Sequence, residues 1–331
     1  MNYLTLRDIQ LAHERIHGIV HKTPVIQSHL LNAWLGHEIF FKVEAFQKIG
    51  AFKSRGACNT IAWLIENNNK PKHIVANSSG NHAQAVAWAA GRYNIPSTIF
   101  MPANASKIKI QATRSMGAEV DLSETRDISD QRVSFSAQEK DTYWIHPFNH
   151  DQVICGQGTA AYEALNEIQD IDCIISPCGG GGLLSGTLIA TRGLSAKTKV
   201  IGAEPLNAND AAISLRNKSI YKLTSTPDTI ADGAMTLAVG NITFEYLQQL
   251  DELYEIEEEK ILYWSQWLSH LLKVVVEPTS AMAMEAARKW LSTKKTKQRL
   301  MIILSGGNID METYMKIWKI NYLEQLPAIH N

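Results

Sequence analysis

A run of four glycines is the pattern in this sequence that most clearly suggests a bound ligand. It covers Gly179 to Gly182 and follows an apolar segment typical of a strand. Glycine lets a backbone wrap closely around a ligand, and N–H groups near a helix start attract anions, so the run predicts a phosphate site. A dinucleotide site is the competing interpretation: the G-x-G-x-x-G spacing is absent, although Glu204 lies where a ribose-binding acid would. A flexible turn is the remaining alternative.

Three further segments carry groups suited to chemistry. The segment from Ser78 to His82 offers hydroxyls, an amide and helix-start N–H groups, which suit a carboxylate. Lys53 lies beside Phe52 and near a second cation, Arg55, and such a lysine can have a lowered pKa and act as a nucleophile. The turn from Ser305 to Asn308 follows an apolar segment. Taken singly, the three also fit a helix-capping turn, a solvated lysine and a tight turn.

The elements that must position these groups alternate between strand and helix. Thr5 and Asp8 form a capping-box pattern that predicts a helix through about Ile19. Residues 73–102 read as strand, glycine turn, helix and strand, which is a βαβ unit. The alternation predicts an α/β fold with open, mostly parallel sheets flanked by helices, in which ligands bind at the carboxyl ends of the strands. We expect the other strands at residues 37–44, near 120, and at 172–177, 199–205 and 299–304, with helices at 57–67, 106–116 and 159–167.

Composition narrows the classes of protein. The chain has 331 residues, 45% of them apolar, and a net charge of −1, so we expect more than one domain and no nucleic-acid partner. It has neither a long apolar run nor a basic, apolar start, so we expect no membrane span and no secretory signal. The four cysteines form no C-x-x-C pair, which favours reduced thiols in a cytoplasmic protein. They are Cys58, Cys155, Cys173 and Cys178.

Seven motifs in register resemble the fold-type II enzymes that use pyridoxal 5'-phosphate (PLP), in particular the serine racemase and serine/threonine dehydratase family. The resemblance extends from about Thr23 to Asn308. It implies a two-domain fold like the tryptophan synthase β chain, with residues 1–70 and 149–331 forming a large PLP-binding domain and residues 71–148 a small substrate-loop domain. The motifs are GAFKSRGA, SSGNHAQA, GQGT, GGGGLLSG, AEP, TIADG and EPTSA.

The resemblance also implies roles for individual residues. Lys53 would hold PLP as a Schiff base and act as the base on one face, with Phe52 beside it. Gly179, Gly180, Gly181 and Gly182 would hold the phosphate. Asn81 would bond the ring hydroxyl and Ser305 would face the ring nitrogen. The substrate carboxylate would be bound by Ser78, Ser79, Asn81 and His82.

A cation site is implied as well. Glu204, the carbonyl of Ala208 and Asp210 are similar to the family's Mg²⁺ or Ca²⁺ ligands, and two carboxylates with a carbonyl suit a hard cation. The alternative for these residues is an ordinary pair of surface acids.

The resemblance implies a homodimeric lyase that dehydrates and deaminates L-threonine and L-serine, with Ser79 permitting serine racemase activity. The alternatives are a dehydratase of threo-3-hydroxyaspartate or another β-hydroxy amino acid, and a catalytically silent PLP- or nucleotide-binding sensor. Three departures limit the transfer of roles. Phe148 replaces a polar residue found in serine racemases, Cys155 replaces a common alanine, and Arg126 is out of register with an arginine that helps some members hold a second carboxylate.

Overall fold

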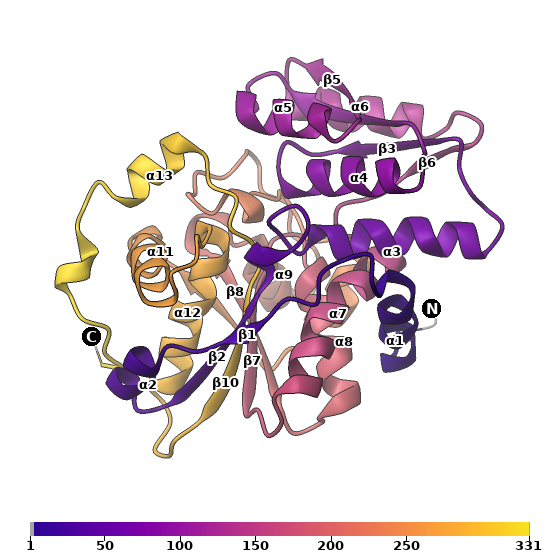
Figure 1. The fold of residues 1–331 in the computed structure, drawn as a ribbon. Coiled ribbons are helices and arrows are strands. Elements are labelled where there is room, and N and C mark those ends of the chain that lie inside the picture. The colour runs from indigo at the N-terminus through magenta and orange to yellow at the C-terminus, as the bar shows by residue number, and fades with distance from the viewer. Residues whose placement is uncertain (1–2, 331) are drawn as a thin grey trace.

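Two sheets organise the chain in a computed structural model that describes residues 3–330. Figure 1 shows the smaller sheet and its helices lying above the larger one, with the N-terminal helix to one side. The strands of the small sheet all come from residues 73–144, and those of the large sheet come from both sides of this segment. An α/β fold of mostly parallel sheets flanked by helices is therefore confirmed.

The large sheet has the strand order β1-β2-β10-β7-β8-β9. All neighbours are parallel except β1 and β2. Its strands are β1 (Val25–Ile26), β2 (Glu38–Val43), β7 (Cys173–Pro177), β8 (Lys199–Pro205), β9 (Glu252–Ile256) and β10 (Arg299–Leu304).

Helices cover both faces of this sheet, and the strand sequences show why. In β10, Leu300, Ile302 and Leu304 enter one apolar core, while Met301 and Ile303 enter another. A strand buried on both faces reads as a continuous apolar run, as here. One face is covered by α11 (Glu258–Leu272) and α12 (Pro278–Leu291). The other is covered by α1 (Leu6–Ile16), α7 (Asp151–Glu167), α8 (Gly182–Leu194) and α10 (Asn241–Leu247).

The small sheet is entirely parallel and has the order β5-β4-β3-β6. Its strands are β3 (His73–Asn77), β4 (Ser97–Pro102), β5 (Glu119–Ser123) and β6 (Thr142–Trp144). The accompanying helices are α4 (Asn81–Arg92), α5 (Lys107–Ser115) and α6 (Arg126–Ser136). The remaining helices of the described chain are α2 (His29–Leu35), α9 (Asp210–Asn217) and α13 (Met311–Ile317), with short 3-10 turns at 44–46, 206–208, 232–234 and 322–324.

Helix α3 (Lys53–Glu66) lies between the two sheets (Figure 1). Its Ala57 and Ile61 share one core with Ala83 and Val86 of α4 and Val153 of α7. The helix that begins with Lys53 is therefore packed against both halves of the molecule.

Buried charges fix the start of α3. The Arg55 side chain is fully buried and binds two carboxylates, Glu44 at 2.7 Å and Glu163 at 2.8 Å. Lys42 is buried as well and binds Glu163 at 2.6 Å. Two cations thus meet two anions, which satisfies every charge in the cluster.

Most expected elements are found, with shifted ends. The capping box of Thr5 and Asp8 is present, but its helix ends at Ile16, before the expected Ile19. The helix expected at residues 57–67 begins earlier, at Lys53, and the one expected at 159–167 begins at Asp151. Gly156 and Gly158 made a helix start at Asp151 hard to predict, because glycine disfavours helices. A Cβ at either position would come within 2.7 Å of neighbouring atoms, so glycine allows close helix packing there.

Candidate functional site

The carboxyl ends of β3, β7 and β10 lead into the serine loop (residues 78–80), the glycine run (residues 179–182) and Ser305. The chain before Lys53 lies against the end of β10: Phe52 donates its N–H to the Ser305 carbonyl at 3.0 Å, and Ala51 pairs with Gly306. The lysine segment and the Ser305 turn, far apart in sequence, therefore lie side by side.

Lys53 is a half-buried cation at the first position of α3. Its Nζ donates to the Pro147 carbonyl at 2.7 Å and lies 5.1 Å from the centre of the Phe52 ring. It forms no ion pair within residues 3–330. Burial lowers the pKa of Lys53 to about 8, while the Glu277 carboxylate acts in the opposite direction. Such an amine has a substantial neutral fraction near pH 7–8 and can act as a nucleophile or a base.

The glycine run lies at the junction between β7 and α8. Gly181 has φ of 91°, a conformation that side-chain-bearing residues rarely adopt, and α8 begins at Gly182. A Cβ at Gly180 would overlap the Phe148 ring, and Phe148 follows Pro147, which accepts the bond from Lys53. The first N–H groups of a helix lack intrahelical partners, so this run fits a phosphate next to Lys53.

The serine loop precedes α4. Ser78 accepts the Gly80 N–H at 3.1 Å, and Asn81 begins the helix. The His82 Nε2 contacts the Ile145 carbonyl at 2.8 Å, while its buried Nδ1 has no partner among the described residues. Burial lowers the pKa of His82 to about 3, and Lys53 acts in the same direction, so the imidazole is neutral near pH 7. The loop and helix start can bind a carboxylate through N–H and hydroxyl groups.

Ser305 and Asn81 meet through Glu277, a residue for which the sequence predicted no role. The Glu277 carboxyl accepts from the Ser305 Oγ at 3.1 Å and from the Asn81 Nδ2 at 3.1 Å. Burial raises the pKa of Glu277 to about 7, and Asp232 acts in the same direction. The available sequence signal was a glutamate inside the EPTSA motif, next to the N-terminal proline of α12.

Glu204 and Asp210 lie together at the end of β8, behind the glycine run. Both are about 1% exposed, so they are not the pair of surface acids considered as the alternative. Glu204 accepts N–H groups from Ala211 and Ala212, and the Asp210 Oδ2 has no partner among the described residues. Burial raises the pKa of Asp210 to about 7. A buried, unpartnered carboxylate oxygen fits a cation, although residues 3–330 contain no group of three or more acidic, histidine or cysteine ligands.

The departures noted in the sequence have clear positions. Phe148 packs on the glycine run, and Cys155 lies on α7 with its side chain buried in the core. Arg126, at the start of α6, donates to the Met235 carbonyl at 2.7 Å, and Lys109 of α5 binds Asp232 at 2.5 Å. Two cations from the small-sheet side therefore reach across to residues 232–235, at the end of the TIADG segment and just after it. All four cysteines are free and buried.

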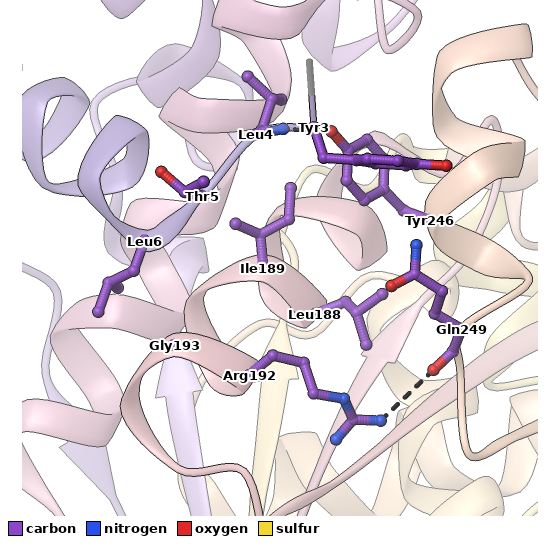
Figure 2. Close-up of a pocket in the computed structure, with 10 residues that line it drawn as sticks. All are labelled: Tyr3, Leu4, Thr5, Leu6, Leu188, Ile189, Arg192, Gly193, Tyr246 and Gln249. Atoms are coloured by element: carbon purple, nitrogen blue, oxygen red, sulfur yellow. Dashed lines mark hydrogen bonds between the residues drawn. The ribbon is translucent and has the colours of Figure 1, made fainter. Parts of the chain in front are cut away.

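A cavity of about 570 Å³ lies elsewhere, between the N-terminal segment and α8 (Figure 2). Its polar groups are engaged within the protein: Tyr246 accepts the Leu4 N–H at 2.8 Å, and Arg192 binds Asp251 at 2.7 Å. Among residues 3–330, no free polar group converges there as at Lys53, so the geometry favours the strand ends as the candidate site. None of the described helices is long and apolar enough to cross a membrane.

Comparison with known proteins identifies the family of the chain. Residues 16–306 match the family described as "Pyridoxal-phosphate dependent enzyme". The chain is 41% identical to the L-threo-3-hydroxyaspartate ammonia-lyase of Saccharomyces cerevisiae, covering 94% of this chain and 95% of that protein. It is 38% identical to the serine racemase of Dictyostelium discoideum, over 96% and 98% of the two chains.

Two solved structures of similar sequence have the same fold as this chain. The T.th. threonine deaminase superposes with a TM-score of 0.87 at 37% identity, covering 93% of this chain and 99% of that chain. The Dictyostelium discoideum serine racemase superposes with a TM-score of 0.86 at 38% identity, with the same coverage. Each is named for chemistry on a small amino acid.

Proposed function

Since the chain belongs to the pyridoxal-phosphate dependent enzyme family, we propose that it is an ammonia-lyase that dehydrates and deaminates L-threonine and L-serine. The products are 2-oxobutyrate or pyruvate, plus ammonia. The observation that carries the proposal is Lys53, a half-buried lysine with a lowered pKa beside the glycine run and Ser305. Relatives that are racemases and ammonia-lyases support an enzyme over a silent sensor.

The residues present fit PLP. Lys53 would hold the cofactor covalently, the N–H groups from Gly179 to Gly182 would bind its phosphate, Asn81 would bond its ring hydroxyl and Ser305 would face its ring nitrogen. When bound, PLP supplies an electron sink for the carbanion left at the substrate Cα.

The chain itself would bind the substrate and move the proton. The hydroxyls of Ser78 and Ser79 and the helix start at Asn81 and His82 would hold the substrate carboxylate. The Lys53 amine, once free and neutral, would take the proton from Cα. Phe148 and Phe52 would exclude water beside it, because apolar rings offer no partner to a solvent molecule.

Two other activities rest on specific observations. Ser79 lies in the serine loop, where its hydroxyl could donate a proton to the substrate Cα on the face opposite Lys53, and this supports serine racemase activity. Similarity to two L-threo-3-hydroxyaspartate ammonia-lyases supports that substrate as the second candidate. Lys109, which is 16% exposed and paired with Asp232, is a cation that a second carboxylate could reach only by displacing or sharing with Asp232.

A four-substrate assay separates these activities. The purified holoenzyme and the Lys53→Ala variant are incubated with L-serine, D-serine, L-threonine and threo-3-hydroxyaspartate, and oxo acids and enantiomers are measured. We expect pyruvate from L-serine and 2-oxobutyrate from L-threonine, with both products lost in the variant. Turnover of hydroxyaspartate alone would favour the second candidate, and an absence of D-serine from L-serine would exclude racemisation.

We further propose a cation site, Mg²⁺ or Ca²⁺, at Glu204, the Ala208 carbonyl and Asp210. The unpartnered buried Asp210 Oδ2 supports it. The bound cation would neutralise two carboxylates behind the glycine run and so stabilise the loop that holds the phosphate.

The wider organisation is proposed on the family resemblance. The two sheets support two domains, residues 1–70 with 149–331 and residues 71–148. The free thiols support a cytoplasmic location. Exposed methionines on α13, Met311 at 72% and Met315 at 66%, support self-association as a homodimer. Light scattering of the parent and of Met315→Glu would give the mass of each and test this assembly.

A further inference from the structure

Glu277 connects the two residues that the proposed function places at opposite polar atoms of the cofactor ring. It is 1% exposed and stands at the N-terminal cap of α12. One carboxyl oxygen contacts the Ser305 hydroxyl and the other contacts the Asn81 amide, each at 3.1 Å. A Cβ at Gly306 would come within 2.7 Å of this carboxyl, so glycine there leaves the space that Glu277 fills.

We infer that Glu277 is a positioning residue that sets the direction of the Ser305 hydrogen bond to the ring nitrogen and presents the Asn81 amide as a donor to the ring hydroxyl. The inference rests on the proposed function for the identity of the ligand. Glu277 would thereby influence whether the ring nitrogen carries a proton.

The Ser305 hydroxyl has one hydrogen and more than one possible acceptor. The Ser280 hydroxyl lies 2.9 Å from both the Gly306 carbonyl and the Ser305 Oγ, and it accepts the Gly306 N–H. When the Ser280 hydrogen goes to the Gly306 carbonyl, which cannot donate, Ser305 has a single hydrogen to share between Glu277 and the ring nitrogen.

The protonation state of Glu277 then decides where that hydrogen goes. An ionised Glu277 can only accept, so Ser305 donates to it and turns a lone pair to the ring, which suits a protonated nitrogen. A protonated Glu277 donates to Ser305 and frees the Ser305 hydrogen for an unprotonated nitrogen. The proton on Glu277 and the proton on the ring nitrogen are therefore coupled.

The surroundings of Glu277 allow both states near neutral pH. Within residues 3–330 it forms no ion pair. The charged groups that face it are Lys53 from α3, Lys109 from α5 and Asp232 from the 3-10 turn. Burial and Asp232 raise the pKa of Glu277 to about 7. The Asn81 amide, the Ser305 hydroxyl and Lys109 act in the opposite direction and lower it.

The hydrogen bonds of the Asn81 amide leave it a donor for the ring hydroxyl. Its Oδ1 accepts from the Asn308 Nδ2 at 2.8 Å, and one hydrogen of its Nδ2 goes to Glu277. Asn308 itself is fixed by the Ile49 carbonyl at 2.7 Å. Asn81 therefore has one N–H left, which it can donate to the ring hydroxyl.

The test compares Glu277→Gln with the parent as PLP-loaded proteins. Glutamine can donate to Ser305 at every pH and so imitates the protonated carboxyl. We expect the variant to bind PLP and to show, from pH 6 to 9, the absorbance that the parent shows only at the acidic end. The matching step in the pH profile of kcat/KM should also be lost. A Glu277→Gln protein that retains the parent's spectral titration would overturn the inference.

Two further variants keep the result clear. Ser305→Ala retains Glu277 but removes the hydroxyl between it and the ring, so the spectral step should disappear there too, and its persistence would contradict the coupling. Glu285→Gln, a buried carboxyl bound to Trp264 and Arg288 away from the site, should titrate like the parent. The spectral titration tests the role of Glu277 even if the protein forms no oxo acid. The proposed function fails separately, if the parent protein does not turn over its substrates.

Discussion

Replacing Arg55 with methionine should destabilise the protein strongly, although no part of the side chain reaches solvent. The guanidinium is fully buried and donates two bonds to each of two carboxylates, at 2.7 and 2.9 Å to Glu44 and at 2.8 Å twice to Glu163. Burial alone would lower the pKa of Arg55, but the two carboxylates raise it above its usual range. The cation is therefore bound firmly, and methionine would remove a charge while filling most of the volume.

The magnitude follows from the charges that remain. After Arg55→Met, Glu44 and Glu163 would share the single buried cation Lys42, which leaves one anion uncompensated. Breaking a buried pair in this way costs about 3–5 kcal/mol. At roughly 2 °C per kcal/mol for a chain of this size, the melting temperature should fall by about 6–10 °C.

Thermal unfolding followed by circular dichroism provides the assay. Arg7→Met is the matched control, because Arg7 and Glu14 are 63% and 62% exposed and such pairs contribute little. Adding Glu44→Gln to Arg55→Met restores charge neutrality and should recover part of the loss. A melting temperature for Arg55→Met within about 1 °C of the Arg7→Met control would refute the reasoning, since a buried uncompensated carboxylate could not then be present.

Three other outcomes follow. Chelation by EDTA should lower the melting temperature, and Ca²⁺ or Mg²⁺ should restore it in the parent but not in Asp210→Ala; an unchanged parent would argue against the cation site. Gly180→Ala should reduce retention of PLP on dialysis, because its Cβ would overlap the Phe148 ring, and unchanged retention would contradict the packing of the glycine run. The depressed pKa of His82 means that the folded state binds its proton more weakly than the unfolded chain, so the stability contributed by neutral His82 is complete above about pH 6.5 and falls as the pH drops toward 3. Between pH 6.5 and 5 the parent should lose about 2 kcal/mol more than His82→Asn in urea unfolding, and equal losses would refute the assignment.

The strands were predictable because parallel sheets bury them on both faces and leave short apolar runs. The expected strand KVIGAEP matches β8, Lys199–Pro205, and RLMIIL matches β10. Helix ends were less predictable. Lys53 lies inside α3 although Gly56 follows it, because that glycine allows close contact with Gly156 and Gln157 of α7, a tertiary effect that helix propensity does not contain.

The parts of the site read directly from sequence are those in loops at strand ends, namely the glycine run, the serine loop and Ser305. Glu277 could not be assigned in that way, because its partners Asn81 and Ser305 are 196 and 28 residues away along the chain. The role of a buried carboxyl depends on the groups that the fold places next to it. The same holds for Asp210, which in sequence resembles a surface acid and in the structure is buried, with its Oδ2 unpartnered among the described residues.

The central claim is that Lys53 holds PLP, and peptide mapping after borohydride reduction tests it most directly. Reduction fixes a cofactor bound to a lysine amine, and mass spectrometry of the digested protein locates it. We predict a single modified lysine, Lys53, within the segment GAFKSRGA, and no visible absorbance from bound cofactor in Lys53→Ala. A cofactor that is released intact after reduction, or is found on another lysine such as Lys109, would contradict the account.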